Sequence, residues 1–221
     1  MMKGAIFDVD GTLLDSMKIW EEAGERYLAS RGIAAEPDLG RKLFEMTMKE
    51  GAQYLKDHYG ITDPADQLIA GINRVVESFY REEAELKEGV REFLHSLRER
   101  GIRMTAATST DRYLIEAAFR RLNITEYFEQ IFTCSEVGAG KTEPVIYRMA
   151  ASAMGTRPEE TFVFEDAFYA LTTASEAGFR TVGIYDASSA SLQDKLKERS
   201  DLYLTGYGEF SSFWEKASHL K

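Results

Sequence analysis

The chain has 221 residues, of which 44% are hydrophobic and 29% charged, a composition typical of a globular protein with a sizeable core. Its 37 acidic and 27 basic residues give a formal net charge of −10, which disfavours nucleic acids and anionic membranes as partners because both are bound through clustered Lys and Arg. The single cysteine, Cys134, excludes an intrachain disulfide and lies in an apolar run typical of a core position. The chain opens without a signal segment, and no apolar stretch approaches the roughly eighteen residues of a transmembrane helix, so we expect a cytoplasmic protein.

Short apolar segments predict strands along the chain at 3–8, 102–108, 130–134, 161–165 and 180–184, with a weaker one at 201–204. Apolar residues at three- and four-residue spacing predict helices between them, at 90–100, 111–122, 144–154 and 168–177. Strands that alternate with helices are typical of a parallel sheet covered on both faces. We therefore predict an α/β fold with a Rossmann-like core.

One stretch breaks this alternation, because only helical patterns follow the first strand. They cover 20–30, 41–46, 48–59 and 64–83, separated by Gly32, Pro37, Gly60 and Pro64. We interpret residues 16–85 as an all-helical cap domain inserted into an α/β core domain formed by 1–15 and 86–221. The two connections, near Asp15 and Leu86, are the expected hinges.

The first strand runs directly into Asp8-Val9-Asp10-Gly11-Thr12. Ligands of open α/β sheets lie beyond the carboxyl ends of the strands, and two neighbouring acids there are costly unless a cation holds them. The same letters also occur in plain turns, where Asp and Gly serve backbone geometry alone. They also open calcium loops, but the next residues, Leu13-Leu14-Asp15-Ser16-Met17, lack the further acidic ligands of such a loop.

Three other strands end in residues of matching chemistry. The strand 102–108 leads to Thr108-Ser109, which taken alone is also typical of a helix N-cap. The strand 130–134 leads through a glycine-rich loop to Lys141, which alone is an ordinary surface lysine. The strand 161–165 ends at Glu165-Asp166, two acids that need a compensating cation at the end of a central strand. Together these strand ends indicate one site at one edge of the sheet.

A phosphate ester as substrate gives each residue a task. Mg²⁺ prefers about six hard oxygen ligands and keeps several waters, so Asp8 and Asp166 suffice as direct ligands, with Glu165 bound directly or through water. Lys141 supplies fixed positive charge, and Thr108 and the Ser109 amide can hydrogen-bond phosphate oxygens at a helix start. Asp10 is then free to act as the general acid and later as the base for water.

These four motifs resemble those of the haloacid dehalogenase superfamily. The resemblance covers essentially the whole chain and extends to the subgroup of β-phosphoglucomutase, phosphoglycolate phosphatase and sugar-phosphate phosphatases. It implies that Asp8 is the nucleophile that forms a phosphoaspartate. It also implies that Asp10 is the acid and base, and that the Asp10 backbone carbonyl reaches the Mg²⁺ ion.

The resemblance also has departures. The family often has Lys-Pro-x-Pro where this chain has Lys141-Thr142-Glu143-Pro144, which affects the stiffness of that loop. The mutase has a histidine early in the first cap helix, where this chain has Trp20, and this disfavours the mutase. The intact Asp10 disfavours the phosphonatase and dehalogenase branches.

Substrate choice is expected to reside in the cap. The segment Glu45-Met46-Thr47-Met48-Lys49 resembles the loop that family members point into the site, so Lys49 and Trp20 are candidate specificity residues. Lys49 is otherwise a solvated surface lysine, and Trp20 otherwise packs against cap helices.

We therefore predict a Mg²⁺-dependent phosphatase, a phosphoric monoester hydrolase, acting on a small sugar phosphate-like metabolite. A sugar phosphomutase is the alternative among enzymes. Two further alternatives are a phospho-accepting module like the receiver domains, which are shorter and lack a cap, and an inert binding protein. The sequence does not determine the oligomeric state, and a monomer is consistent with it.

Overall fold

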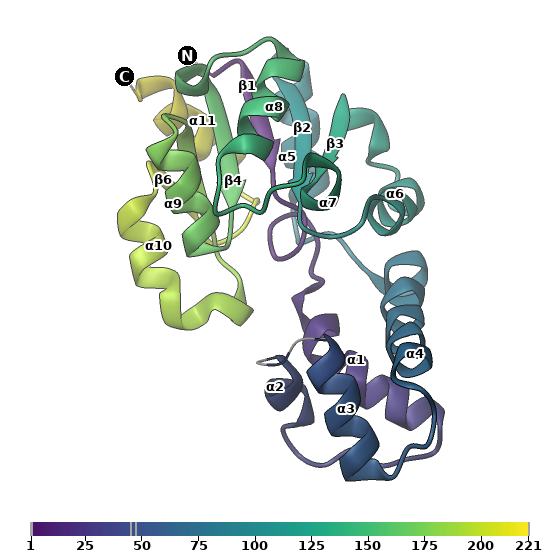
Figure 1. Cartoon of the computed structure of the whole chain (residues 1–221). Coiled ribbons are helices and arrows are strands. Elements are labelled where there is room, and N and C mark those ends of the chain that lie inside the picture. The colour runs from purple at the N-terminus through teal and green to yellow at the C-terminus, as the bar shows by residue number, and fades with distance from the viewer. Residues whose placement is uncertain (1, 45, 47, 221) are drawn as a thin grey trace. The chain divides into compact units, whose positions relative to one another are not determined.

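A computed structural model of the chain describes residues 2–44, 46 and 48–220. The chain divides into two compact units (Figure 1). We call Met1–Asp15 together with Glu85–Lys221 the core unit, and Ser16–Ala84 the helical unit.

The core unit is built on one parallel sheet of six strands in the order β3-β2-β1-β4-β5-β6. The strands are β1 (Gly4–Phe7), β2 (Arg103–Thr108), β3 (Gln130–Thr133), β4 (Thr161–Glu165), β5 (Arg180–Ile184) and β6 (Leu202–Leu204). Their residues are largely apolar and buried, as expected of a sheet covered on both faces. The predicted α/β fold with a parallel sheet is confirmed, and β1 and β4 lie at its centre.

Helices cover both faces of this sheet (Figure 1). Successive side chains of a strand point to opposite faces, so Ile6 and Val163 pack with α8 and α9 in one buried cluster. On the other face Phe7 stacks on Phe164 with 4.3 Å between ring centroids, and Phe164 contacts Phe93 of α5 and Phe213 of α11. The α-helices of the core unit are α5 (Val90–Glu99), α6 (Arg112–Arg121), α7 (Cys134–Val137), α8 (Val145–Met154), α9 (Phe168–Glu176), α10 (Gln193–Arg199) and α11 (Phe210–His219). Short 3₁₀ turns lie at η2 (Thr125–Tyr127), η3 (Pro158–Glu160) and η4 (Ala187–Leu192).

The predicted strand at 130–134 ends one residue early. Thr133 Oγ1 accepts a hydrogen bond from the Glu136 backbone N–H at 3.3 Å, which caps the start of α7. Cys134 is therefore the first residue of a helix and is half-buried at the edge of the core cluster.

The helical unit contains α1 (Met17–Ser30), α2 (Leu39–Phe44), α3 (Met48–Tyr59) and α4 (Ala65–Ser78), followed by the π-helical turn η1 (Phe79–Glu83). Leu28, Leu55 and Leu68 are fully buried among these helices. The close approach of α4 to α1 needs a glycine, because a Cβ on Gly71 would lie 2.3 Å from the Tyr27 ring. No helix among the described residues is both long and apolar enough to cross a membrane.

The segments of the core unit that lead to and from the helical unit pair with each other. Leu14 and Leu86 form an antiparallel bridge, and the Asp15 amide donates to the Glu85 carbonyl at 3.0 Å. The Lys87 amide donates to the Leu13 carbonyl at 2.9 Å. The turn after β1 is thus tied directly to the segment that precedes α5.

Candidate active site

Three buried carboxylates meet where the two central strands end. In the pairing of β1 with β4, Phe7 lies opposite Phe164, so the next residues along each strand, Asp8 and Glu165, are neighbours. One carboxylate oxygen each of Asp8, Glu165 and Asp166 lies within 4.8 Å of the others. The structure therefore brings together the acids that the sequence placed at the ends of two different strands.

Lys141 lies between two of these acids. Its ammonium donates to Asp8 Oδ1 and, at 2.5 Å, to Glu165 Oε1. The residue is only 4% exposed, so it is not the surface lysine that its loop suggests when read alone. Burial opposes the charge of Lys141, but Asp8 and Glu165 outweigh it and hold the pKa of the ammonium well above its ordinary value. Lys141 is therefore a fixed positive charge beside Asp8.

The three acids still carry more negative charge than Lys141 neutralises. Burial and the charge of Glu165 raise the pKa of Asp8 to about 6, although Lys141 opposes the shift. Burial, with the charges of Asp8 and Glu165, raises the pKa of Asp166 to about 9. A cation between the three carboxylates would relieve this repulsion.

One oxygen of this cluster also lacks a partner. Among the described residues, Glu165 Oε2 is the buried side-chain polar atom with no hydrogen bond. Leaving a charged oxygen buried and unpaired is costly, whereas a divalent cation binds such oxygens. The donor set, the charge and the unpaired oxygen all fit a metal ion, and Asp8, Glu165 and Asp166 could hold it.

Asp10 lies in the turn that follows β1, outside the group of three acids. Its Oδ2 accepts a hydrogen bond from Thr110 Oγ1 at 2.7 Å. Gly11 next to it has a φ of 80°, a left-handed conformation that glycine adopts without strain, and this lets the chain reverse between Asp10 and Thr12. Thr12 in turn donates from its hydroxyl to Asp166 Oδ1 at 3.2 Å. The turn after β1 thus separates the surroundings of Asp8 and Asp10 and bonds to the acid pair of β4.

The hydroxyl residues Thr108, which ends β2, and Ser109, which follows it, lie at the same edge of the sheet. Thr108 is buried, and its Oγ1 accepts from the Thr110 amide at 3.0 Å. Ser109 is exposed, with its Oγ 3.5 Å from Cys134 Sγ. Asp111, and neither Thr108 nor Ser109, occupies the N-cap position of helix α6, and it makes no side-chain capping hydrogen bond there. Thr108 and Ser109 are therefore not required as a helix cap.

Trp20 and Lys49 belong to the helical unit. Trp20 on α1 is 38% exposed and its ring centroid lies 6.4 Å from that of Tyr80. It also lines an apolar pocket within this unit, together with Met48 and Val76. Lys49 is exposed on α3, while Glu45 and Thr47 of the predicted cap loop lie outside the described residues. Substrate contact by Trp20 and Lys49 stays a prediction.

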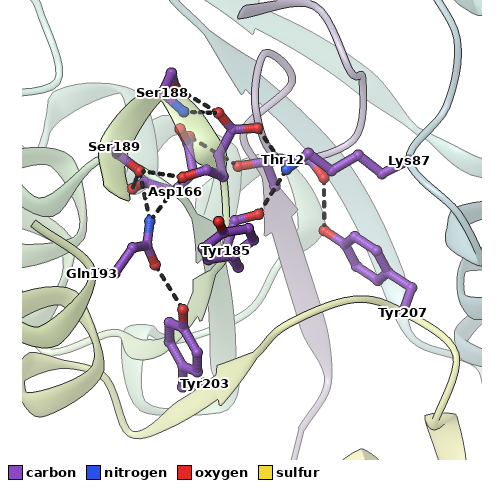
Figure 2. A network of polar contacts seen from close by, with 10 residues as sticks. Thr12, Lys87, Asp166, Tyr185, Ser188, Ser189, Gln193, Tyr203 and Tyr207 are labelled. Atoms are coloured by element: carbon purple, nitrogen blue, oxygen red, sulfur yellow. Dashed lines mark hydrogen bonds and ion pairs between the residues drawn. The ribbon is translucent and has the colours of Figure 1, made fainter. Parts of the chain in front are cut away.

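Sequence reasoning missed a second layer of residues that holds Asp166 (Figure 2). Ser189 Oγ donates to the Asp166 carbonyl at 3.3 Å, and Gln193 donates to Ser189 Oγ at 2.7 Å. Gln193 accepts in turn from the Tyr203 hydroxyl at 2.7 Å. The polar stretch after β5 carries no recognisable motif, so only the fold reveals this chain of bonds.

The same view shows an ion pair and a buried tyrosine that sequence reasoning also missed (Figure 2). Lys87 Nζ lies 2.7 Å from Asp186 Oδ2 and also donates to the Tyr185 carbonyl at 2.7 Å. The Tyr207 hydroxyl donates to the Thr12 carbonyl at 3.0 Å. The turn after β1 and the loop after β5 are therefore both fixed by long-range polar contacts.

Comparison with known proteins identifies relatives over most of the chain. A family model of haloacid dehalogenase-like hydrolases matches residues 2–178. The chain is 29% identical to a phosphorylated carbohydrates phosphatase of Thermotoga maritima, over 82% of this chain and 84% of that protein. It is 31% identical to a glyceraldehyde 3-phosphate phosphatase of Methanopyrus kandleri, over 83% and 84%. A solved Thermotoga maritima structure, provisionally named β-phosphoglucomutase, matches with a TM-score of 0.84 and 26% identity over 97% of this chain and 99% of that one.

Proposed function

The chain belongs to the haloacid dehalogenase-like hydrolase family, and we propose that it is a Mg²⁺-dependent phosphatase that removes the phosphate of a small phosphorylated carbohydrate through a phosphoaspartate on Asp8. The resemblance predicted from the four motifs is thereby confirmed, as is the enzyme class, since relatives of the chain are named phosphatases. The observation that carries the proposed mechanism is the buried contact of Lys141 with both Asp8 and Glu165, beside Asp166.

The reaction begins on Asp8. Its carboxylate oxygen forms a bond to phosphorus while the bond from phosphorus to the leaving oxygen breaks. Asp10 gives its proton to that leaving oxygen, and the dephosphorylated product departs. Lys141 holds the Asp8 carboxylate in place and offsets negative charge, and Thr108 with the Ser109 amide bonds the phosphate oxygens.

A water molecule then attacks the phosphorus of the phosphoaspartate. Asp10 takes the proton of this water, the bond between phosphorus and the Asp8 oxygen breaks, and inorganic phosphate leaves. Both residues return to their starting states. Asp8, Glu165 and Asp166, with the Asp10 carbonyl, would hold the Mg²⁺ ion, which supplies positive charge to the phosphoryl oxygens.

The substrate class rests on the relatives, which are named for phosphorylated carbohydrates and glyceraldehyde 3-phosphate. We assign the helical unit, which is the predicted cap domain 16–85 without Glu85, the role of selecting the leaving group, with Trp20 and Lys49 as contacts. A small phosphate ester in the cytoplasm is the proposed partner. The net charge of −10 disfavours nucleic acid.

The experiment is a phosphate-release screen over phosphorylated carbohydrates, with Mg²⁺ and with a chelator in its place. We expect Asp8→Asn to lower kcat at least about a thousand-fold, as loss of a nucleophile does, whereas the exposed Asp194→Asn leaves it unchanged. Wild-type enzyme that is incubated with a substrate carrying radioactive phosphate and then quenched in acid should retain label that hydroxylamine releases. Full activity of Asp8→Asn, or activity that survives chelation, would contradict the mechanism.

A sugar phosphomutase is the second candidate, favoured by the likeness to the structure provisionally named β-phosphoglucomutase. Trp20 in place of the mutase histidine argues for the phosphatase. Product analysis distinguishes the two, because a mutase yields an isomerised sugar phosphate and a phosphatase yields free phosphate.

A further inference from the structure

Tyr147 is a buried residue of α8 whose hydroxyl reaches the acid cluster. The side chain is 1% exposed, and the hydroxyl donates to Glu165 Oε1 at 2.9 Å. A longer contact of 3.4 Å joins the same hydroxyl to the Ala170 carbonyl. The Tyr147 ring packs in the core cluster against Phe179, at 6.2 Å between ring centroids. The ring and the hydroxyl of Tyr147 therefore have different surroundings and can be tested separately.

The hydrogen bonds of Glu165 are distributed unevenly between its two oxygens. Oε1 accepts from both Lys141 and Tyr147, whereas Oε2 is buried and accepts from no described residue. Two donors that converge on one oxygen fix the plane of the carboxylate, because rotation of that plane would break at least one of the bonds. The orientation that remains leaves one whole oxygen to other ligands.

The hydroxyl of Tyr147 is suited to this task. It is a neutral donor, and it already donates to Glu165 Oε1 from a buried position. Lys141 alone does not define the plane of Glu165, because its ammonium is shared with Asp8. The neutral hydroxyl adds a second bond without adding charge to the cluster.

We infer that Tyr147 is a positioning residue that orients Glu165 and keeps its second oxygen available to the metal ion. This inference rests on the proposed function, since it requires a metal at Asp8, Glu165 and Asp166. Partners of metal-binding side chains typically contribute about 10- to 100-fold to metal affinity. Tyr147 contacts Glu165 and acts through it rather than on the substrate.

The test is Mg²⁺ binding to the full-length protein, measured by isothermal titration calorimetry for wild type and Tyr147→Phe. Phenylalanine keeps the ring in the core and removes only the hydroxyl. We expect the Kd for Mg²⁺ to rise about 10-fold or more. The Mg²⁺ concentration for half-maximal phosphate release should rise by the same factor, with less than about a two-fold change in substrate KM.

The matched control is Tyr54→Phe. Tyr54 also donates to a glutamate, Glu36, but within the helical unit, and its loss should leave Mg²⁺ affinity unchanged. A double-mutant cycle with Glu165→Gln tests whether Tyr147 acts through Glu165. If it does, Tyr147→Phe should lower the Mg²⁺ affinity much less in the Glu165→Gln background than in wild type. The cycle also detects a general weakening of the core, which would persist in that background.

The outcomes separate the two proposals. Wild type that neither binds Mg²⁺ nor needs it for phosphate release overturns the proposed function together with this inference. Wild type that binds Mg²⁺ while Tyr147→Phe binds it equally well overturns the inference alone, and a lower melting temperature of the variant would then show a purely structural role.

Discussion

Replacing Lys87 with methionine should destabilise the core unit in a pH-dependent way. The Lys87 side chain is 17% exposed, and its ammonium lies 2.7 Å from Oδ2 of Asp186, whose side chain is 7% exposed. Lys87→Met keeps most of the aliphatic stem and removes only the charge. The variant would leave the buried Asp186 carboxylate with two remaining donors, the amide and hydroxyl of Ser188.

The expected loss follows from this environment. Removing one partner of a buried ion pair costs about 3–5 kcal/mol. The partial exposure of Lys87 and the two Ser188 donors lower this figure, so we expect about 2 kcal/mol at neutral pH. For a chain of this size that corresponds to a fall of about 4–8 °C in Tm.

The pH dependence follows from the pKa of Asp186. Burial opposes ionisation, but the hydrogen bonds from Lys87 and Ser188 outweigh it and lower the pKa of Asp186 below its ordinary value. A carboxylate with a lowered folded-state pKa stabilises the fold fully above its unfolded-state pKa, which is about 3.9 for Asp. That contribution is lost as the pH falls through the folded-state pKa. The difference in the free energy of unfolding between wild type and Lys87→Met should therefore start to narrow near about pH 4 and shrink further as the pH falls toward the folded-state pKa of Asp186.

Urea unfolding followed by circular dichroism at neutral pH and at about pH 4 and pH 3.5 measures this gap. The exposed Lys195→Met serves as the matched control and should change the free energy of unfolding by less than about 0.5 kcal/mol. The reasoning would be refuted if Lys87→Met lowered the free energy of unfolding as much in acid as at neutral pH. It would also be refuted if the loss at neutral pH were no larger than that of Lys195→Met.

Two further predictions concern Thr110, which bonds to the proposed general acid Asp10, and Gly89, which precedes α5. Thr110→Val removes the donor to Asp10 Oδ2, so kcat on a sugar phosphate should fall about 10-fold. The kcat on p-nitrophenyl phosphate should change less than about two-fold, because its leaving group needs little protonation. Equal losses of kcat on the two substrates in steady-state assays would contradict the role of Asp10 as the acid. Gly89 has a φ of 81°, and an added Cβ would lie 3.0 Å from the Tyr207 carbonyl carbon, so Gly89→Ala should lower the free energy of unfolding by about 2 kcal/mol. Gly101→Ala, with a φ of 70° and open space, should cost only about 1 kcal/mol, and equal urea-unfolding losses for the two variants would count against the clash.

Local pattern was enough to place most of the elements of the core unit. Strands β4 and β5 have the predicted bounds, because each contains a buried apolar run, Phe162-Val163-Phe164 in β4 and Val182-Gly183-Ile184 in β5. Helices α10 and α11 were not predicted. The spacing of Phe210, Phe213, Trp214 and Ala217 is typical of one face of a helix and could have predicted α11. The pattern Thr133-x-x-Glu136 is likewise typical of a helix start and could have predicted α7.

The sequence by itself determined which residues stand at the strand ends, since Asp8, Thr108 and Glu165 each follow directly from an apolar run or close one. Strand order and register then bring Asp8 beside Glu165, and only the tertiary structure decided what bonds to them. Lys141 is separated from Asp8 by 133 positions, and Lys87 from Tyr185 by 98. Helical periodicity marks Tyr147 only as a core residue, whereas the packing of α8 against the sheet directs its hydroxyl to Glu165. Local patterns report burial, which each segment encodes by itself. The partner of a buried polar group depends on how distant segments pack, and no single segment encodes that.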